Sequence, residues 1–359
     1  MDHHLLAINF GSTSTKIAWH EGERCLAKEN LAHDPALIGS LPDIYAQHDL
    51  RLAAIRDFIA RHGIDTGRLA AVVSRGGQTR PLPSGAYDID ALMLEDIASE
   101  RHGVHSTNLG VILAAELGRQ WGCRAMTVDP PVSDEFEPLA RLSGLPEISR
   151  KSSFHVLNQK AAARRLCRDL GLAYGKARII GVHLGGGVSV CAHENGRLAD
   201  ANNALDGDGP YSTSRSGGLP VGDLVRLCFS GATRDDILTR INGQGGVRAY
   251  LGTTDMIEVE RRINAGDEKA RLVLEGMCYQ TAKEIGGMAA VLKGRVDAIL
   301  LTGGMAHSEL ITGLIRERVA FIAPVHVYPG EDEMESLALG ALRVLSGEEP
   351  ARRLAELAS

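Results

Sequence analysis

The sequence predicts an α/β protein built from two similar halves, and three observations support this prediction. Short aliphatic and β-branched runs alternate with longer segments of helical periodicity along the 359 residues. The segment AINFGSTSTKIA resembles GVHLGGGVSVCA, and the offset between them is close to half the chain. A third segment, DAILLTGGMAHSELI, has the pattern of a buried strand that runs into two glycines and then a helix.

Composition limits the classes of function. With 44% hydrophobic residues the chain can bury a sizeable core, and its length predicts two domains. A net charge of −6 with dispersed Lys and Arg argues against a nucleic-acid surface. Six cysteines without a CxxC pair argue against a disulfide framework or a zinc ribbon. No apolar run approaches the length of a membrane span, and the N-terminus lacks a secretory pattern. We therefore expect a cytoplasmic protein with no membrane partner.

The order of the elements follows from these patterns. In the helix expected over 52–63, Leu52, Ile55, Phe58 and Ile59 recur at helical spacing, and Gly63 is the expected C-cap. The polar stretch around 146–153 marks the expected boundary, which gives domains 1–150 and 151–333. Strands are expected at 5–10, 69–74, 124–129, 178–184, 297–304 and 325–330, and further helices at 108–122, 158–171 and 277–294.

The internal repeat pairs Asn9 with His183 and Gly11 with Gly185, and each copy has the pattern strand, glycine turn, strand. The β-branched residues that follow the first turn, Thr13 and Thr15 among them, favour a second strand over a helix. A P-loop is absent, because GSTSTK lacks the required glycine before its lysine. Two ordinary β-hairpins would have the same pattern.

Glycine turns let backbone N–H groups approach a phosphate without a clash from Cβ. Gly185, Gly186 and Gly187 would thus close on ATP phosphates, and two such turns could hold a polyphosphate from both sides. The strand-to-helix corner at Gly303 and Gly304 could hold the adenosine, although a plain strand-to-helix turn would have the same sequence.

Seven motifs occur in this order along the chain: INFGSTSTK, VVSRGGQTRPL, GVHSTNLG, VHLGGGVSV, ALDGDGPYSTSRSGGLP, LLTGGMAHSELI and PGEDEMESLALGALRVL. Together they resemble the acetate and butyrate kinase family, which belongs to the superfamily that holds actin, hexokinase and the Hsp70 ATPase domain. The resemblance spans nearly the whole chain. Within the family, the sequence resembles the butyrate kinases most, in its chain length and in the motifs HLGGG and DGDGPYSTSRSGGLP.

The resemblance implies two similar domains of the actin-like ATPase fold with the nucleotide in the cleft between them, and a C-terminal helix at about 334–359 that returns to the first domain. It also implies reversible phosphoryl transfer between ATP and a short-chain carboxylate, with butanoyl phosphate and ADP as products. Acetate, propionate or a branched acid are alternative substrates. A nucleotide sensor or ATPase of the same fold is a further alternative, which would need no arginines for a carboxylate. A homodimer or larger homo-oligomer is expected.

The resemblance also implies roles for individual side chains. Arg75 and Arg215 would orient the carboxylate and stabilise the transferring phosphoryl group. His155 would bind that group, His105 would line the site, and His183 belongs to the second phosphate turn. The carboxylate nucleophile is already ionised at pH 7, so these histidines would serve as hydrogen-bond donors and not as general bases.

Magnesium is the metal that the resemblance implies. Asp129 follows an apolar strand, at the strand end where α/β proteins place their ligands. Glu333 and Asn9 are the other candidates, and Glu331 and Glu335 lie so near Glu333 that a small shift of register would exchange them. The first phosphate turn is completed by Gly11, Ser12, Thr13, Ser14 and Lys16.

Overall fold

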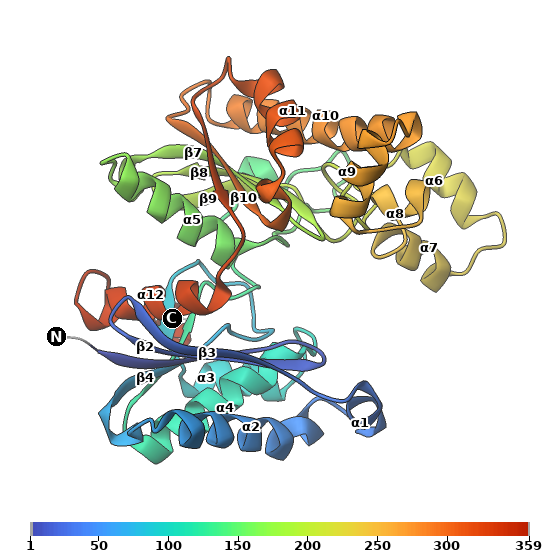
Figure 1. The fold of residues 1–359 in the computed structure, drawn as a ribbon. Helices are drawn as coiled ribbons and strands as arrows, with labels where there is room; N and C mark the ends of the chain where they lie inside the picture. Colours follow the sequence, from blue (N-terminus) through green and yellow to red (C-terminus); the bar gives the residue numbers. More distant parts are fainter. Residues whose placement is uncertain (1–2, 358–359) are drawn as a thin grey trace. The chain divides into compact units, whose positions relative to one another are not determined.

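The chain folds into two compact units in the computed structural model, which describes residues 3–357 (Figure 1). Unit 1 contains the chain up to residue 134 and again from residue 332 onward, and unit 2 contains residues 135–331. The sequence had suggested a boundary near residue 150. The segment before that position instead packs on unit 2, because the Glu137 N–H donates to the Ala199 carbonyl over 2.9 Å and Arg150 pairs with Asp200 at 2.9 Å.

Unit 1 is built on a six-stranded sheet whose strands lie in the order β3-β2-β1-β4-β6-β5. The first three strands form an antiparallel meander, and β4 and β6 extend the sheet in parallel to β1. The strands are β1 (His4–Phe10), β2 (Ser14–Glu21), β3 (Arg24–Ala32), β4 (Leu69–Ser74), β5 (Ala86–Asp88) and β6 (Arg124–Val128).

Helices cover both faces of this sheet, as Figure 1 shows. On one face α2 (His48–His62) and α4 (Ser106–Trp121) pack against alternate residues of β1, with Ile8, Phe58 and Leu113 fully buried. On the other face α12 (Glu333–Leu345) packs against β1, β4 and β6. The smaller helices of this unit are α1 (Pro35–Ser40), α3 (Ala91–Ala98) and α13 (Leu354–Leu357).

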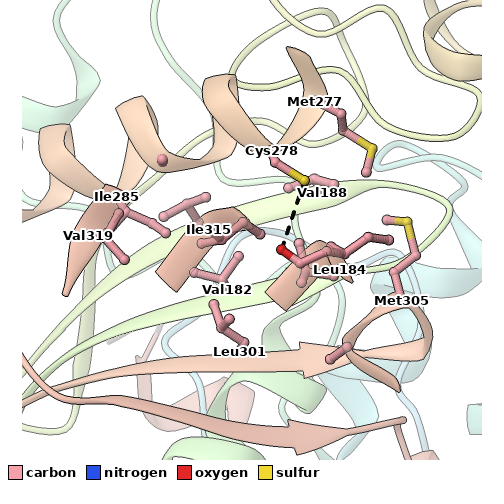
Figure 2. Close-up of a cluster of buried hydrophobic side chains, with 14 of the residues drawn as sticks. Val182, Leu184, Val188, Met277, Cys278, Ile285, Leu301, Met305, Ile315 and Val319 are labelled. Carbon is pink, nitrogen blue, oxygen red and sulfur yellow. Dashed lines mark hydrogen bonds between the residues drawn. The ribbon is translucent and has the colours of Figure 1, made fainter. Parts of the chain in front are cut away.

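Unit 2 is built on a five-stranded sheet of order β11-β10-β7-β8-β9. Helix α5 packs against β7 and β10, while α10 and α11 form the main core with the same sheet (Figure 2). In that core Val182, Leu301 and Ile315 are fully buried, and the Cys278 thiol lies 3.9 Å from the Ile311 carbonyl. The strands are β7 (Arg178–Leu184), β8 (Val188–Glu194), β9 (Arg197–Ala201), β10 (Ala298–Gly303) and β11 (Val325–Pro329), and the helices are α5 (Val156–Asp169), α6 (Val221–Cys228), α7 (Arg234–Ile241), α8 (Gly246–Leu251), α9 (Met256–Asn264), α10 (Glu268–Val291) and α11 (Glu309–Val319).

The internal repeat is confirmed by the topology. Read from the outer strand of each meander, β3-β2-β1-β4-β6 corresponds to β9-β8-β7-β10-β11. In each unit a hairpin of the first two strands ends in a turn of equal length, 11–13 in unit 1 and 185–187 in unit 2. The strand expected after the first turn is β2, so this loop does not open a helix.

The ends of two helices show how local chemistry sets the elements. Gly63 closes α2 with φ of 60°, the left-handed C-cap that the sequence predicts. The single C-terminal helix expected over about 334–359 is instead interrupted after Leu345, because Gly347 adopts φ of 78° and Pro350 follows.

Within residues 3–357, no helix combines the length and apolarity that crossing a membrane requires.

Candidate functional site

A cluster of charged side chains surrounds Glu333 at the first turn of α12. Its Oε2 accepts hydrogen bonds from Asn9 Nδ2 and from Lys16 Nζ, each at 2.8 Å. Its Oε1 pairs with Arg75 Nη1, also at 2.8 Å. Asn9 and Lys16 face each other across the β1–β2 hairpin, and Arg75 directly follows β4. Three neighbouring strands therefore bring predicted site residues to one carboxylate.

The charge of Glu333 is maintained by its neighbours. Burial by itself raises the pKa of this carboxyl, but the positive charges of Arg75 and Lys16, together with the hydrogen bonds from Lys16 and Asn9, outweigh burial and hold the pKa below its usual value. Glu333 is thus ionised at neutral pH.

Of the three glutamates that sequence left in question, Glu333 is the one in this cluster. Glu331 Oε2 instead lies 3.7 Å from His183 Nε2 in unit 2.

Asp129 lies in the turn that follows β6, packed against the turn that carries Arg75. Its backbone has φ of 42°, unusual for a residue other than glycine, and its side chain is buried. Gly76 has no room for a Cβ, which would collide with Thr127 and Pro130 on either side of Asp129. The turns after β4 and β6 thus approach closely, and this brings the Arg75 and Asp129 positions to the same edge of the sheet.

His105 occupies the N-cap of α4. Its Nδ1 accepts a hydrogen bond from the Thr107 N–H at 3.3 Å, so the hydrogen of the neutral ring lies on Nε2. Burial, and then the positive charge of Arg75, lower the pKa of His105. The side chain is therefore a neutral hydrogen-bond donor near Arg75, as its predicted role requires.

In unit 2, Arg215 lies against the second glycine turn. Its Nη1 donates to the Ala204 carbonyl at 2.5 Å, and burial lowers its pKa from the usual range. A Cβ on Gly187 would overlap the guanidinium of Arg215, whereas a Cβ on Gly186 would meet nothing within 4 Å. The structure thus brings together two predicted site elements that lie about thirty positions apart in the chain.

His155 and His183 stack face to face, with ring centroids 3.9 Å apart and planes 14° from parallel. His155 Nδ1 lies 3.1 Å from the Ser189 hydroxyl, and His183 Nδ1 lies 2.8 Å from Asn158 Oδ1. The stack places the two predicted histidines side by side, next to the second glycine turn, where a Cβ on Gly185 would collide with the His183 ring.

A buried polar network behind His155 was not predicted from the sequence. The Gln159 amide donates to the Ser189 and Gly181 carbonyls at 3.1 and 3.3 Å, so its oxygen accepts from His193 Nε2. Complete burial lowers the pKa of His193 to about 3, so the ring is neutral and its Nδ1 accepts from the Tyr174 hydroxyl at 3.0 Å. The alternation of GGGVSV, which turns Ser189 inward, was the signal available in the sequence.

Gly303, at the predicted adenosine corner, can only be a glycine. Its φ is 91°, and a Cβ there would collide with the backbone of Leu184, immediately before the second glycine turn. A short 3₁₀ helix from Gly304 to His307 and then α11 follow, as the strand-Gly-Gly-helix pattern predicts. A Cβ on Gly304 would meet nothing within 4 Å. The corner therefore adjoins the second glycine turn of the same unit.

Asn9 and Glu333, near the first glycine turn, offer oxygen atoms of the kind that a magnesium ion binds. Asn9 Oδ1 is buried and has no hydrogen-bond partner among the described residues, and Glu333 is an ionised carboxylate beside it. Residues 3–357 contain no group of three or more His, Cys, Asp and Glu side chains that could hold a metal. These donors suit Mg²⁺, which keeps several waters and takes one or two carboxylates, better than a metal enclosed by protein ligands.

Comparisons with known proteins extend these observations. Residues 147–324 match the family model described as the acetokinase family. The chain is 48% identical over 350 residues to butyrate kinase 2 of Clostridium acetobutylicum, a match that covers 97% of this chain and 98% of that protein.

Among solved structures, acetate kinase of Porphyromonas gingivalis matches with a TM-score of 0.77 and 22% identity, over 96% of this chain and 100% of that one. A propionate kinase of Francisella tularensis matches with a TM-score of 0.72 and 19% identity, over 94% and 98% of the two chains. The predicted fold, two similar α/β domains of the actin-like ATPase type, is confirmed.

Proposed function

The chain belongs to the acetokinase family, and from this premise we propose that it is a butyrate kinase that transfers a phosphoryl group reversibly between ATP and butanoate. The observation that carries the proposal is an arginine at the predicted site residues of each unit. Arg75 joins the Glu333 cluster beside the first turn, and Arg215 lies against the second. A nucleotide sensor or a simple ATPase would not need both guanidinium groups.

The reaction requires little covalent chemistry from the protein. A carboxylate oxygen of butanoate attacks the γ-phosphorus in line, and the bond from that phosphorus to the bridging oxygen breaks, so ADP leaves with the electron pair. No proton has to move, because the nucleophile is already ionised at neutral pH. The transition state spreads negative charge over the equatorial oxygens, so fixed positive charges and N–H donors supply most of the stabilisation.

The side chains of unit 1 fit the binding and orienting part of this task. The N–H groups of the first turn, with the hydroxyls of Ser12, Thr13 and Ser14, would bind phosphate oxygens. Lys16 adds a positive charge that Glu333 holds in place over 2.8 Å. Arg75 would hold the carboxylate of the substrate, and the neutral His105 would donate from Nε2.

In unit 2 the histidines fit the role of donors to the phosphoryl group. We assign the Nε2–H form to His155, since the Ser189 hydroxyl lies 3.1 Å from its Nδ1 and can donate to it. Arg215 would stabilise the equatorial oxygens as an arginine finger does. The turn at 185–187 would bind phosphate through its N–H groups, and Gly303 and Gly304 would contact the adenosine.

Magnesium would be held by Asn9 Oδ1 and Glu333, with Asp129 ordering the ion or its water. When bound, the ion would neutralise charge on the phosphates of the nucleotide. Both oxygens of Glu333 already accept from Asn9, Lys16 or Arg75. Coordination at this carboxylate would therefore require one of these partners to share or leave its oxygen.

The acyl chain is the part of the proposal that depends most on the comparison. The 48% identity to a butyrate kinase supports a four-carbon acid. Acetate, propionate and branched acids are the alternatives, and they differ by methylene groups worth about 0.8 kcal/mol each when buried.

A hydroxylamine trap for acyl phosphate tests the proposal. Purified protein with Mg-ATP would be incubated with acetate, propionate, butyrate, isobutyrate and valerate in parallel. We expect the largest kcat/KM with butyrate. A maximum at acetate would replace the substrate and keep the reaction, whereas no product with any acid, despite measurable ATP binding, would refute kinase activity on short-chain carboxylates.

The expected homodimer or larger homo-oligomer stays a prediction, which sedimentation equilibrium of the same preparation would check.

A further inference from the structure

An arginine outside the predicted site lies directly behind the first glycine turn. Arg51, in the first turns of α2, has no exposed surface and is the largest of the fully buried side chains. Its guanidinium donates to the carbonyls of Gly11 at 2.8 Å, Ser12 at 3.2 Å and Ser14 at 2.8 Å. One side chain thus binds three of the four carbonyl groups between Gly11 and Ser14.

The hydrogen-bond partners of this guanidinium in the described part of the chain are all uncharged. Among the described residues, no carboxylate forms an ion pair with Arg51, and its remaining partners are Gln47 Oε1, at 2.7 and 2.9 Å, and Thr15 Oγ1, at 3.2 Å. The Phe10 ring lies 4.8 Å away from its Cζ. Burial lowers the pKa of Arg51 to about 10, which leaves it charged at neutral pH. A buried charge without a counter-ion is costly, so its retention calls for a reason.

The hydrogen bonds fix the direction of the peptide groups in the turn. In a trans peptide the C=O and the following N–H point in opposite directions. Because Arg51 binds the carbonyls of Gly11 and Ser12, the N–H groups of Ser12 and Thr13 must point away from it. Within residues 3–357 neither N–H has a hydrogen-bond acceptor, and both residues are exposed. The turn therefore presents two unpaired donors on the side opposite a buried cation.

The second glycine turn is built differently. There the Gly186 carbonyl accepts from the Ser212 hydroxyl at 2.6 Å, a neutral donor. A neutral hydroxyl can therefore orient a carbonyl of such a turn, and the guanidinium of Arg215, which lies against this second turn, donates to Ala204 and not to a carbonyl of the turn. The buried charge at the first turn is an additional feature, and its natural complement is an anion on the open side of the turn.

We propose that Arg51 is a positioning residue for phosphate: it orients the Ser12 and Thr13 N–H groups toward a nucleoside triphosphate, and its uncompensated charge strengthens their attraction for it. The proposal rests on the proposed function for the identity of the ligand. It requires no contact between Arg51 and the ligand.

Two substitutions separate geometry from charge. Arg51→Lys keeps the charge but cannot reach three carbonyls with a planar fork. Gln47→Glu supplies a carboxylate of the same size next to Arg51 and leaves the bonds to the turn in place. Arg61→Met is the matched control, because Arg61 lies on the same helix, is 48% exposed and pairs with Glu29.

The measurement is the affinity for ATP and for adenosine by calorimetry, with the melting temperature of each variant. We expect Arg51→Lys to lose about tenfold or more in ATP affinity and Gln47→Glu about threefold to tenfold, since a buried charge next to the turn is only weakly screened. Adenosine affinity should stay within about twofold for both variants, because adenosine carries no phosphate, and Arg61→Met should match the unmodified protein.

A loss of affinity for ATP and adenosine alike would indicate a structural role and overturn the proposal. Unchanged ATP affinity in both folded variants would overturn it as well. If Arg51→Lys does not fold, Gln47→Glu alone decides by the same criteria. The outcome is separable from that of the hydroxylamine assay, because nucleotide binding can depend on Arg51 whether or not any carboxylate is phosphorylated.

Discussion

Substitutions at the two adjacent glycines of the second turn should have different kinetic effects. A methyl group on Gly187 would overlap the Arg215 guanidinium, while one on Gly186 would enter open space. Neither position has the positive φ that would strain an alanine. The two alanine variants therefore make the same chemical change in the same turn, and only one of them displaces the arginine.

The size of the effect follows from how far Arg215 must move. Its Nη1 would have to shift by about 1 Å to restore an ordinary contact, and a misplacement of that size costs on the order of 10²-fold in rate. This corresponds to about 2.7 kcal/mol of transition-state stabilisation. We expect Gly187→Ala to lower kcat by this factor with little change in KM for ATP, and Gly186→Ala to raise KM for ATP by crowding the phosphate.

The hydroxylamine assay at varied ATP and butyrate concentrations gives both parameters, and melting temperatures test whether each variant folds. A double-mutant cycle gives the sharpest check. If Gly187→Ala acts through the guanidinium, it should have almost no further effect in an Arg215→Ala background. Full kcat in Gly187→Ala, or additive losses in the double variant, would refute the reasoning.

Three further predictions concern single side chains. Arg215→Ala should lower kcat by on the order of 10³-fold with the fold intact, and a loss below tenfold in the same assay would remove its role in the transition state. Glu333→Gln should destabilise unit 1 by about 1 to 3 kcal/mol in urea unfolding at pH 7, because Lys16 and Arg75 lose their shared partner. The folded pKa of Glu333 is depressed, so the loss of unfolding free energy in Glu333→Gln should be full at pH values above the unfolded pKa and should shrink as the pH falls through the folded pKa. A loss that stays constant down to pH 3 would contradict the assignment. His193 has a folded pKa of about 3, below its unfolded pKa of about 6.5. The free energy of unfolding of the unmodified protein should therefore fall by about 1.4 kcal/mol per pH unit as the pH falls between those two values. His193→Asn should lack that slope, and parallel pH profiles for the two proteins would show that His193 is not buried in its neutral form.

The extent to which sequence predicted the site depended on the kind of signal. Glycine turns and the arginines beside them are local patterns, and the structure brings Arg215 to Gly187 and Arg75 to Glu333. The polar chain through Gln159 and His193 joins strands and a helix that are distant in sequence. Strand alternation indicates that Ser189 faces inward, but periodicity assigns no partner to any of these residues, so the hydrogen-bonded network itself could not be predicted.

The domain boundary and Arg51 illustrate the same limit. The stretch before residue 150 is polar and resembles a linker, yet Phe136 is buried in unit 2 and Arg150 pairs with Asp200. An arginine near the start of an amphipathic helix is usually solvated, and the expected helix at 52–63 began just after Arg51. Its burial depends on the β1–β2 turn folding over it, which is a tertiary contact.

The balance of charge around the first turn ties these observations together. Lys16 and Arg75 share the carboxylate of Glu333, and within residues 3–357 no carboxylate forms an ion pair with Arg51. The buried charge of Arg51 is thus left without a counter-ion beside the first glycine turn. Such an arrangement is less stable alone than with an anion bound, because every ligand charge that arrives reduces the repulsion. A nucleoside triphosphate would supply that charge, so ATP should raise the melting temperature of the protein well above the effect of adenosine, and Gln47→Glu should reduce this difference by giving Arg51 a carboxylate of its own.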